Sequence, residues 1–290
     1  MLGIIGDLVE DIIVWLAEDV QHGTDTDVEM FHTRGGSGAN VASFAGRLGP
    51  TRFIGCVGDD YLGDALVSGL TAEGVDVRVQ RRGETGTIVI LIDRTGERTM
   101  LPHRGAATLL DDVPDEWLDG LDILHVPGYS FNGEPVASTS IDVIRRAKRK
   151  GILVSIDASS TGMLTHFGVQ RFLELMADLK PDFLIGNESE SALLGLSVGG
   201  DSGPNLAMLD GTIVVTKAGP EPTVIHRRGA DRITVPVPAV PEVRDLTGAG
   251  DAFAAGFLSS FIASRDLVAA SVGGHAAAAK VLSSPGASQS

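Results

Sequence analysis

The sequence predicts an α/β protein in which a mostly parallel sheet is covered by helices on both faces, with a small β appendage. Short apolar segments rich in β-branched residues alternate with segments of helical periodicity, which is typical of βαβ units. The strand segments are nearly continuous in apolar residues, as expected for strands that are buried on both faces of a sheet. We expect strands at 2–5, 52–57, 123–126, 153–156, 183–185 and 212–216, and helices at 39–48, 62–73, 134–150, 169–179 and 188–194.

The appendage is expected from two stretches that break this alternation. Residues 12–34 and 86–104 contain β-rich segments with no helix between them, and Asp93-Arg94-Thr95-Gly96 is typical of a hairpin turn. The segment 249–282 is almost entirely helical, with a break near 264–266. Because no linker or internal repeat separates these parts, we expect one domain over residues 1–290.

The composition suits a single domain with a sizeable core, since 43% of the 290 residues are hydrophobic and 21% are charged. The single cysteine, Cys56, excludes an internal disulfide and a cysteine-based metal cluster, and the histidines show no metal-ligand spacing. No apolar run is long enough to predict a membrane span, and the N-terminal residues lack the basic region of a signal peptide. We therefore expect a cytoplasmic protein with no membrane partner.

The net charge of −15 argues against nucleic acid as a partner, because binding to a phosphate backbone requires a basic surface. It does not exclude an anionic substrate, since local basic groups and helix N-termini can bind anions inside an acidic protein. The charge therefore leaves a small molecule as the expected partner.

The motif Gly248-Ala249-Gly250-Asp251 lies where the C-terminal helical segment begins. The first N–H groups of a helix have no intrahelical acceptor, and the helix dipole places partial positive charge there. The glycines allow a ligand to approach the backbone, so this turn suits a phosphate. Asp251 then has two interpretations: it accepts the proton of a hydroxyl that attacks the phosphate, or it merely stabilises the first helical turn. The motif alone does not decide between them.

Two motifs at opposite ends of the chain resemble the signatures of the ribokinase-like (PfkB-type) carbohydrate kinases. Asp245 to Phe253 is similar to the C-terminal signature, and Gly35 to Asn40 is similar to the N-terminal one. Landmarks between them extend the resemblance over essentially the whole chain, namely Gly55–Gly63, Gly96–Arg98, Arg104–Ala107, Asn187–Glu190 and Thr216–Gly219. By contrast, the chain lacks the P-loop pattern and the third glycine of a dinucleotide fingerprint.

The resemblance implies a ribokinase-like three-layer α/β/α fold whose β appendage is a lid over the substrate. It implies ATP-dependent phosphorylation of a primary hydroxyl of a small sugar or sugar acid, as in ribokinase, fructokinase or 2-keto-3-deoxygluconate kinase. Asp251 would then be the general base, and Gly248, Ala249 and Gly250 would form the anion hole. Transfer would be direct and in line, so that positioning and electrostatics dominate catalysis.

The resemblance also implies residues for the acceptor. Asp11 would bind substrate hydroxyls, with Asp7 as a competitor for that role, and Asn40 would offer a donor and an acceptor. Arg104 is interpreted either as a ligand for a polar or carboxylate substituent or as a solvated lid arginine, and Tyr129 either as a substrate contact or as a core aromatic. Gly35 and Gly36 would let the sugar approach the backbone closely, and their alternative role is to form a plain turn.

On the nucleotide side, Asn187 and Glu190 would organise Mg²⁺ through water, whereas a helix cap is the alternative role of Asn187. The remaining residues expected beside ATP are Thr216, Lys217, Gly219, Gly248, Gly250 and His275. A K⁺ site is expected at Asp245, Thr247 and Ser284, although Leu246 and Ser284-Pro285 depart from the family pattern.

Two other functions remain open. A nucleoside kinase of the same family would use the same base and anion hole, but a nucleobase requires an apolar or aromatic pocket. Only 5% of the residues are aromatic and the lid is not visibly rich in them, which favours a sugar or sugar acid. A catalytically silent binding protein is disfavoured because Asp251 and the anion hole are intact. The sequence leaves the acceptor, the roles of Arg98 and Arg104, and the oligomeric state undecided, and a homodimer through the lid strands is expected from the resemblance.

Overall fold

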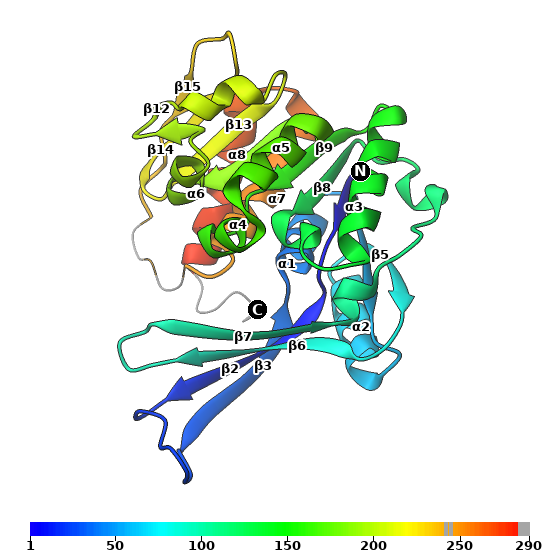
Figure 1. The fold of residues 1–290 in the computed structure, drawn as a ribbon, viewed down its shortest axis with the longest axis vertical. Coiled ribbons are helices and arrows are strands. Elements are labelled where there is room, and N and C mark those ends of the chain that lie inside the picture. Colours follow the sequence, from blue (N-terminus) through cyan, green and yellow to red (C-terminus); the bar gives the residue numbers. More distant parts are fainter. Residues whose placement is uncertain (241–242, 244–245, 284–290) are drawn as a thin grey trace.

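A computed structural model describes residues 1–240, 243 and 246–283, and its main body is built on a nine-stranded sheet (Figure 1). The strand order is β15-β14-β13-β10-β9-β8-β1-β4-β5. The bounds of these strands are β1 Leu2–Ile5, β4 Thr51–Val57, β5 Val75–Arg81, β8 Ile123–Pro127, β9 Leu153–Asp157, β10 Phe183–Asn187, β13 Ile213–Ala218, β14 Glu221–His226 and β15 Ile233–Val235.

Neighbouring strands from β13 to β5 are all paired in parallel, whereas β14 and β15 are added antiparallel at one edge. The carboxyl ends of the parallel strands therefore meet at the same edge of the sheet. After β1 the chain crosses to β4 on one side, whereas β9, which follows β8, lies on the other side. Such a switch point leaves a crevice in which open α/β sheets bind their ligands.

Helices cover both faces of the sheet, and each face has its own hydrophobic core. One core includes residues of α1 (Ser37–Gly46), α2 (Tyr61–Ala72), α7 (Ala249–Ser264) and α8 (Leu267–Leu282). The other includes residues of α3 (Val136–Arg149), α4 (Thr161–Phe167) and α5 (Val169–Leu179). The short helix α6 (Glu188–Leu193) follows β10. The expected three-layer α/β/α architecture is therefore confirmed, and no helix of the described residues has the length and apolarity to cross a membrane.

The N-terminus of α1 lies directly over the end of β1 because glycines meet there. A Cβ added to Gly38 would lie 2.9 Å from the Cα of Gly6, so the two backbones are in contact. A side chain at either position would push α1 away from the sheet, because real Cβ atoms do not approach that closely. This contact fixes the start of α1 at the carboxyl edge of the sheet.

The smaller sheet has four strands in the order β3-β2-β6-β7, and Figure 1 shows its long strands extending along one side of the body. We call this sheet the lid; its strands are β2 (Val9–Leu16), β3 (Val28–Gly35), β6 (Thr85–Ile92) and β7 (Arg98–Gly105). β6 begins at an anchor in the body, where the Asp60 carboxylate accepts hydrogen bonds from the Thr85 N–H at 2.7 Å and its hydroxyl at 2.6 Å.

A neutral histidine lies in the middle of the main sheet. His125 on β8 is fully buried, and its Nδ1 lies 3.0 Å from the Ser155 hydroxyl on the adjacent strand β9. Its Nε2 has no hydrogen-bond partner among the described residues. Burial lowers the pKa of His125 to about 4. The negative charge of Asp157 opposes this decrease, and the positive charge of Lys217 adds to it. The folded protein therefore holds this imidazole uncharged near neutral pH.

Protonation of His125 should destabilise the fold in acid. Between an unfolded pKa of 6.5 and the folded value of about 4, the unfolded chain binds the extra proton. The free energy of unfolding should then fall by about 1.4 kcal/mol per pH unit, or roughly 3 kcal/mol in all. We expect His125→Asn to lack this contribution. Urea unfolding of both proteins from pH 7.5 to 4.5 would measure it as a change with pH in the difference between their free energies of unfolding. A difference that does not change with pH would contradict a neutral His125.

Candidate active site

The first turns of α1 and α7 meet at the crevice, and the Asp251 carboxylate joins them. Gly248 caps α7 with a φ of +77°, a left-handed conformation that favours glycine. One oxygen of Asp251 accepts a hydrogen bond from the Ser37 hydroxyl at 2.7 Å, and the other accepts one from the Asn40 side-chain amide at 3.0 Å. Asp251 is thereby oriented by two donors from a helix more than 200 residues earlier in the chain.

The environment of Asp251 suits a base at neutral pH. Burial raises the pKa of Asp251 to about 6, and the charge of Asp157 acts in the same direction. Hydrogen bonds from Ser37 and Asn40 and the charge of Lys217 oppose this rise. Asp251 is therefore mostly ionised at pH 7, yet its pKa is close enough to neutrality for it to accept a proton effectively.

Asn187 and Glu190 form a closed pair at the start of α6. The Asn187 side-chain oxygen accepts from the Glu190 N–H at 2.9 Å, and the Glu190 carboxylate accepts from the backbone N–H and the side-chain amide of Asn187, both at 2.7 Å. Asn187 therefore does cap the helix, as the alternative interpretation proposed. Burial raises the pKa of Glu190, and Asp157 raises it further.

Asp157 was not identified from the sequence, although it lies among the groups just described. It ends β9, and its Oδ2 lies 3.3 Å from the Lys217 ammonium. It belongs to none of the motifs in the sequence, so residue type and spacing gave no signal. The usable signal was its place directly after a buried parallel strand, because such positions border the crevice.

The other residues expected beside the nucleotide divide into two groups. Thr216 and His275 are buried, with their side chains turned to protein partners: Ser191 lies 3.0 Å from the Thr216 hydroxyl, and Thr223 lies 2.8 Å from His275 Nε2. Lys217 and Gly219 are partly exposed, at the carboxyl edge of β13 and in the following turn. The structure thus places Lys217 at the carboxyl edge of the sheet, whereas the His275 ring is buried against protein groups.

On the acceptor side, the Asp11 carboxylate lies on the backbone of Gly35. A Cβ at Gly35 would be 1.9 Å from Asp11 Oδ1, so a side chain there would displace the carboxylate. That oxygen is buried and has no hydrogen-bond partner among the described residues. Burial raises the pKa of Asp11 to about 6, and neighbouring Glu10 adds to the rise. Asp11 therefore offers an unused acceptor to a substrate hydroxyl.

Arg104 is bound to Asp7 rather than solvated. Its guanidinium donates to both oxygens of the Asp7 carboxylate, at 2.6 and 2.8 Å, and to the Asn132 carbonyl at 2.6 Å. The Asp7 carbonyl in turn lies against Gly36, whose φ is +95° and whose added Cβ would meet that oxygen at 2.3 Å. The pair therefore fastens lid strand β7 to the loop after β1.

Tyr129 lies between the acceptor and nucleotide sides, in the 3₁₀ turn Gly128–Phe131 after β8. Its pKa is raised by burial and by the charges of Asp157, Asp251 and Glu190, while a hydrogen bond from Ser160 opposes the rise. With 36% of its surface exposed, Tyr129 is not a core aromatic.

The face of the lid that carries Asp11 is turned toward α7. Side chains alternate between the two faces of a strand, so Arg98 and Arg104 on β7 share one face. Arg104 reaches Asp7, and Arg98 donates a hydrogen bond to the Thr247 hydroxyl beside the anion hole. Since both arginines reach the body across this face, the residues between them look onto the first turn of α7. We call this surface the inner lid face.

Strand register gives the composition of the inner lid face. The Asp11 row contains Thr33, Asp11, Ile88 and Pro102, and the next row contains Phe31, Ile13, Ile90 and Met100. Phe31 and Met100 expose 47% and 58% of their surfaces. One carboxylate is therefore bordered by an apolar surface with an exposed aromatic ring.

Some expectations fall outside what the structure describes. Asp245 and Ser284, two of the residues expected to bind K⁺, lie outside the described residues, and K⁺ remains a prediction. A dimer through the lid, a cytoplasmic location and the domain limits likewise stay predictions.

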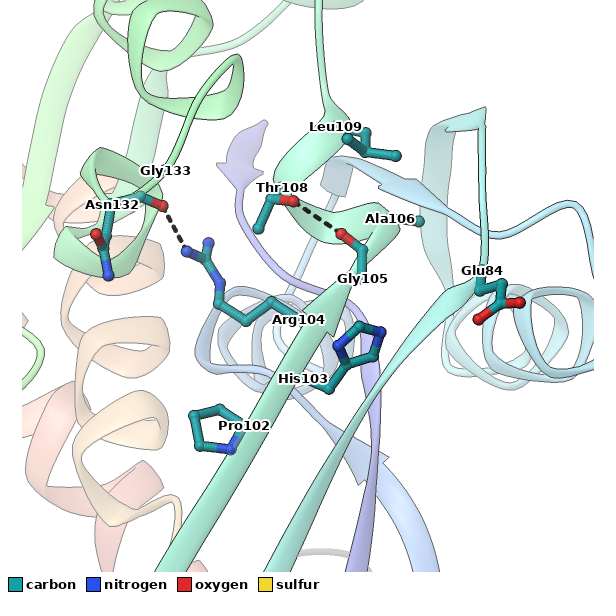
Figure 2. A pocket seen from close by; sticks show the side chains of 10 residues that line it. All are labelled: Glu84, Pro102, His103, Arg104, Gly105, Ala106, Thr108, Leu109, Asn132 and Gly133. Atoms are coloured by element: carbon teal, nitrogen blue, oxygen red, sulfur yellow. Dashed lines mark hydrogen bonds between the residues drawn. The ribbon is translucent and has the colours of Figure 1, made fainter.

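A cavity of about 650 Å³ lies at the base of the lid, where Arg104 extends toward the loop at Asn132 and Gly133 (Figure 2). The Arg104 side chain is the group that this cavity shares with the acceptor side. Its lining includes none of the groups described around Asp251.

Comparison with known proteins gives matches over nearly the whole chain. A model of the pfkB family of carbohydrate kinases matches residues 5–290. A fructokinase of Klebsiella pneumoniae is 31% identical over 283 residues, which cover 90% of this chain and 84% of the fructokinase. An adenosine kinase of Schizophyllum commune is 27% identical over 278 residues, covering 85% and 78% of the two chains.

A solved structure agrees with these matches. The crystal structure of adenosine kinase from Sinorhizobium meliloti has a TM-score of 0.85 and 26% identity, and the match covers 99% of this chain and 95% of that one. The resemblance inferred from the two signatures is thus confirmed. The chain belongs to the pfkB family of carbohydrate kinases and is an ATP-dependent phosphotransferase.

Proposed function

We propose that this kinase transfers the γ-phosphoryl group of ATP to a primary hydroxyl of a small sugar, with Asp251 as the general base. The observation that carries the proposal is the position of Asp251: an oriented carboxylate with a pKa of about 6 at the first turn of a long helix. A residue that only stabilised the helix would need neither the two donors from α1 nor its partial burial.

The residues around Asp251 divide the work of the reaction. Ser37 and Asn40 hold its carboxylate, and Asp11 binds a second hydroxyl of the acceptor, so the attacking oxygen is positioned from two sides. The backbone N–H groups of Gly248 and Gly250 would stabilise the charge of the transferred group. The Ala249 N–H, also expected in this anion hole, donates a hydrogen bond to the Leu246 carbonyl at 3.3 Å in this structure. Tyr129 packs against the acceptor, and closure of the lid excludes water.

Asn187 and Glu190 would hold Mg²⁺ through water. Each Glu190 oxygen accepts hydrogen bonding from Asn187, and its second lone pair remains for a water molecule. A divalent cation beside Glu190 and Asp157 would also offset the repulsion that raises the pKa of Glu190. Binding through water is typical of Mg²⁺, which keeps several waters when bound to protein. When bound with ATP, the ion neutralises phosphate charge.

Arg104 and the inner lid face indicate which kind of acceptor the site could bind. The guanidinium of Arg104 is already paired with Asp7, so this arrangement supports a neutral sugar better than a sugar acid. A nucleoside is the second candidate, and the row with Phe31, Ile13 and Met100 favours it. In that arrangement Asp11 would bind ribose hydroxyls, and the nucleobase would lie on the apolar row.

Replacing Asp251 tests the base directly. Asp251→Asn keeps the size of the side chain but cannot accept the proton, so turnover should fall by roughly 10²–10⁴ while ATP binding persists. The matched control is Asp64→Asn, because Asp64 lies in the first turn of α2 and is exposed. Coupled measurement of ADP production and isothermal titration with an ATP analogue would report both quantities. Equal turnover in the two variants would leave Asp251 as a helix-stabilising residue.

The pH dependence of kcat/KM tests the environment of the base. Asp251 acts only when ionised, so activity should be lost as the pH falls through about 6, by tenfold per unit below it. Asp11 has a similar pKa, and Asp11→Asn separates the two groups, because its residual activity should keep the acid limb. A rate that stays constant down to pH 5 would argue against this base.

A panel of acceptors separates the two candidate substrates. ADP production is measured with ribose, fructose, 2-keto-3-deoxygluconate and several nucleosides. If a nucleoside is the acceptor, Phe31→Ala should lower kcat/KM roughly tenfold by loss of base stacking. Met30→Ala is the matched control, because Met30 is equally exposed on the opposite face of β3. A sugar acceptor predicts little effect of either variant, and no turnover with any member would count against the function.

A further inference from the structure

The side chain of Lys217, which belongs to β13, extends to the first turn of α7. Its ammonium would be 3.3 Å from a Cβ added to Gly250, and it lies 5.9 Å from the centre of the Phe253 ring. Gly250 and Phe253 both belong to the beginning of α7. The side chain therefore extends from the sheet edge to the turn whose backbone N–H groups suit a phosphate.

Among the described residues, the ammonium has one ion pair, and that pair is long. The distance of 3.3 Å to Asp157 Oδ2 exceeds the 2.7–2.9 Å that is typical of a strong charge-assisted bond. A lysine has three donors, and Asp157 provides the acceptor for one of them among the described residues. With 16% and 14% of the two side chains exposed, the pair is largely shielded from solvent. Two N–H groups thus remain for a ligand.

The charge of Lys217 acts on both halves of the site. It lowers the pKa of Asp251 on the acceptor side and that of Glu190 on the nucleotide side. A cation in this place lies between the base and the carboxylate that would organise the metal. The phosphoryl group in transfer has to pass through the same region, because it moves from the nucleotide toward the hydroxyl next to Asp251.

We propose that Lys217 is a catalytic residue whose ammonium binds the phosphoryl group in transfer, and that Asp157 holds it at the start of α7 until ATP arrives. The inference rests on the proposed function. In the transfer step a bond forms between the acceptor oxygen and the γ-phosphorus, and the bond from that phosphorus to the β–γ bridging oxygen breaks. The hydroxyl proton goes to Asp251 and ADP leaves with the bridging oxygen. Lys217 stays protonated and stabilises the charge on the transferred group.

A structural ion pair is the competing explanation, and the choice of variants separates the two. Lys217→Met removes the charge but keeps the length of the side chain, Lys217→Arg keeps the charge, and Asp157→Asn removes the partner. Lys150→Met is the matched control, because Lys150 pairs with Asp115 and Asp119 on the surface. Circular dichroism and thermal unfolding establish that each variant is folded, and Lys217→Gln replaces any Lys217→Met protein that is not.

Nucleotide binding and turnover are then measured on the full chain. With Mg²⁺ present, calorimetry compares a non-hydrolysable ATP analogue with ADP, and steady-state kinetics gives kcat and KM. We expect Lys217→Met to lose affinity for the ATP analogue but not for ADP, and kcat to fall about 10²-fold, as for removal of one charge-stabilising donor. Lys217→Arg should recover part of the loss. Asp157→Asn should keep the preference for the ATP analogue over ADP, because Lys217 is still present to bind the γ-phosphate. The acid limb of kcat/KM should also move to higher pH in Lys217→Met.

Three outcomes would overturn the proposal. One is a Lys217→Met protein whose kcat and ratio of nucleotide affinities match those of wild type. Another is an equal loss of the preference for the ATP analogue over ADP in Lys217→Met and Asp157→Asn, because a structural pair fails in the same way from either side. The third is equal loss of affinity for the analogue and for ADP. Failure of the proposed function is distinguishable, since it would appear as absence of turnover in the wild-type protein while the comparison of nucleotides still reports on Lys217.

Discussion

The contact between the first turns of α1 and α7 is the constraint on which the rest of the site depends. It exists because the backbones of Gly6 and Gly38 touch, which sets the start of α1 over the end of β1. From there Ser37 and Asn40 reach Asp251, and their hydrogen bonds offset part of the cost of burying its charge. Without these donors, burial would favour a protonated carboxyl that could not act as a base. The pKa of about 6 is therefore a balance that the packing of two helices maintains.

The lid is fixed at its base by carboxylates, and this determines what it presents to the crevice. Asp7 binds Arg104 at the end of β7, and Asp60 binds Thr85 at the start of β6. At the end of β3, Arg34 pairs with Glu73 at 2.9 Å. Three of the four strands are thus tied to the body where they enter or leave it. Asp11 lies near this fixed end, whereas Phe31 and Met100 lie farther along the strands.

Much of the fold could be predicted from the sequence because its buried strands and longer helices have distinct patterns. All the strands expected for the main sheet are present, and the lid strands overlap the two expected stretches, although β2 begins at Val9 rather than at residue 12. The strands β5, β14 and β15 are not among those expected from the sequence. β5 lies at one sheet edge, where apolar and charged residues alternate and no continuous apolar run appears, and β14 and β15 are the antiparallel strands at the other edge. In the site, Asp251 and Asp11 could be found from motifs. Asp157 and the Asp7–Arg104 pair could not, since each contact joins segments that only the folded chain brings together.

The inner lid face explains why composition was a weak guide to the acceptor. A low aromatic content favours a sugar, but specificity depends on which side chains share the face that looks onto α7. Strand alternation assigns Phe31 to that face and Met30 to the opposite one, and this choice follows from contacts of Arg98 and Arg104 that no local pattern reveals. The polar end of the face lies beside the base and the apolar row lies beyond it. The small sugar that we propose would contact only the first row, whereas the second candidate, a nucleoside, would also need the apolar row for its base.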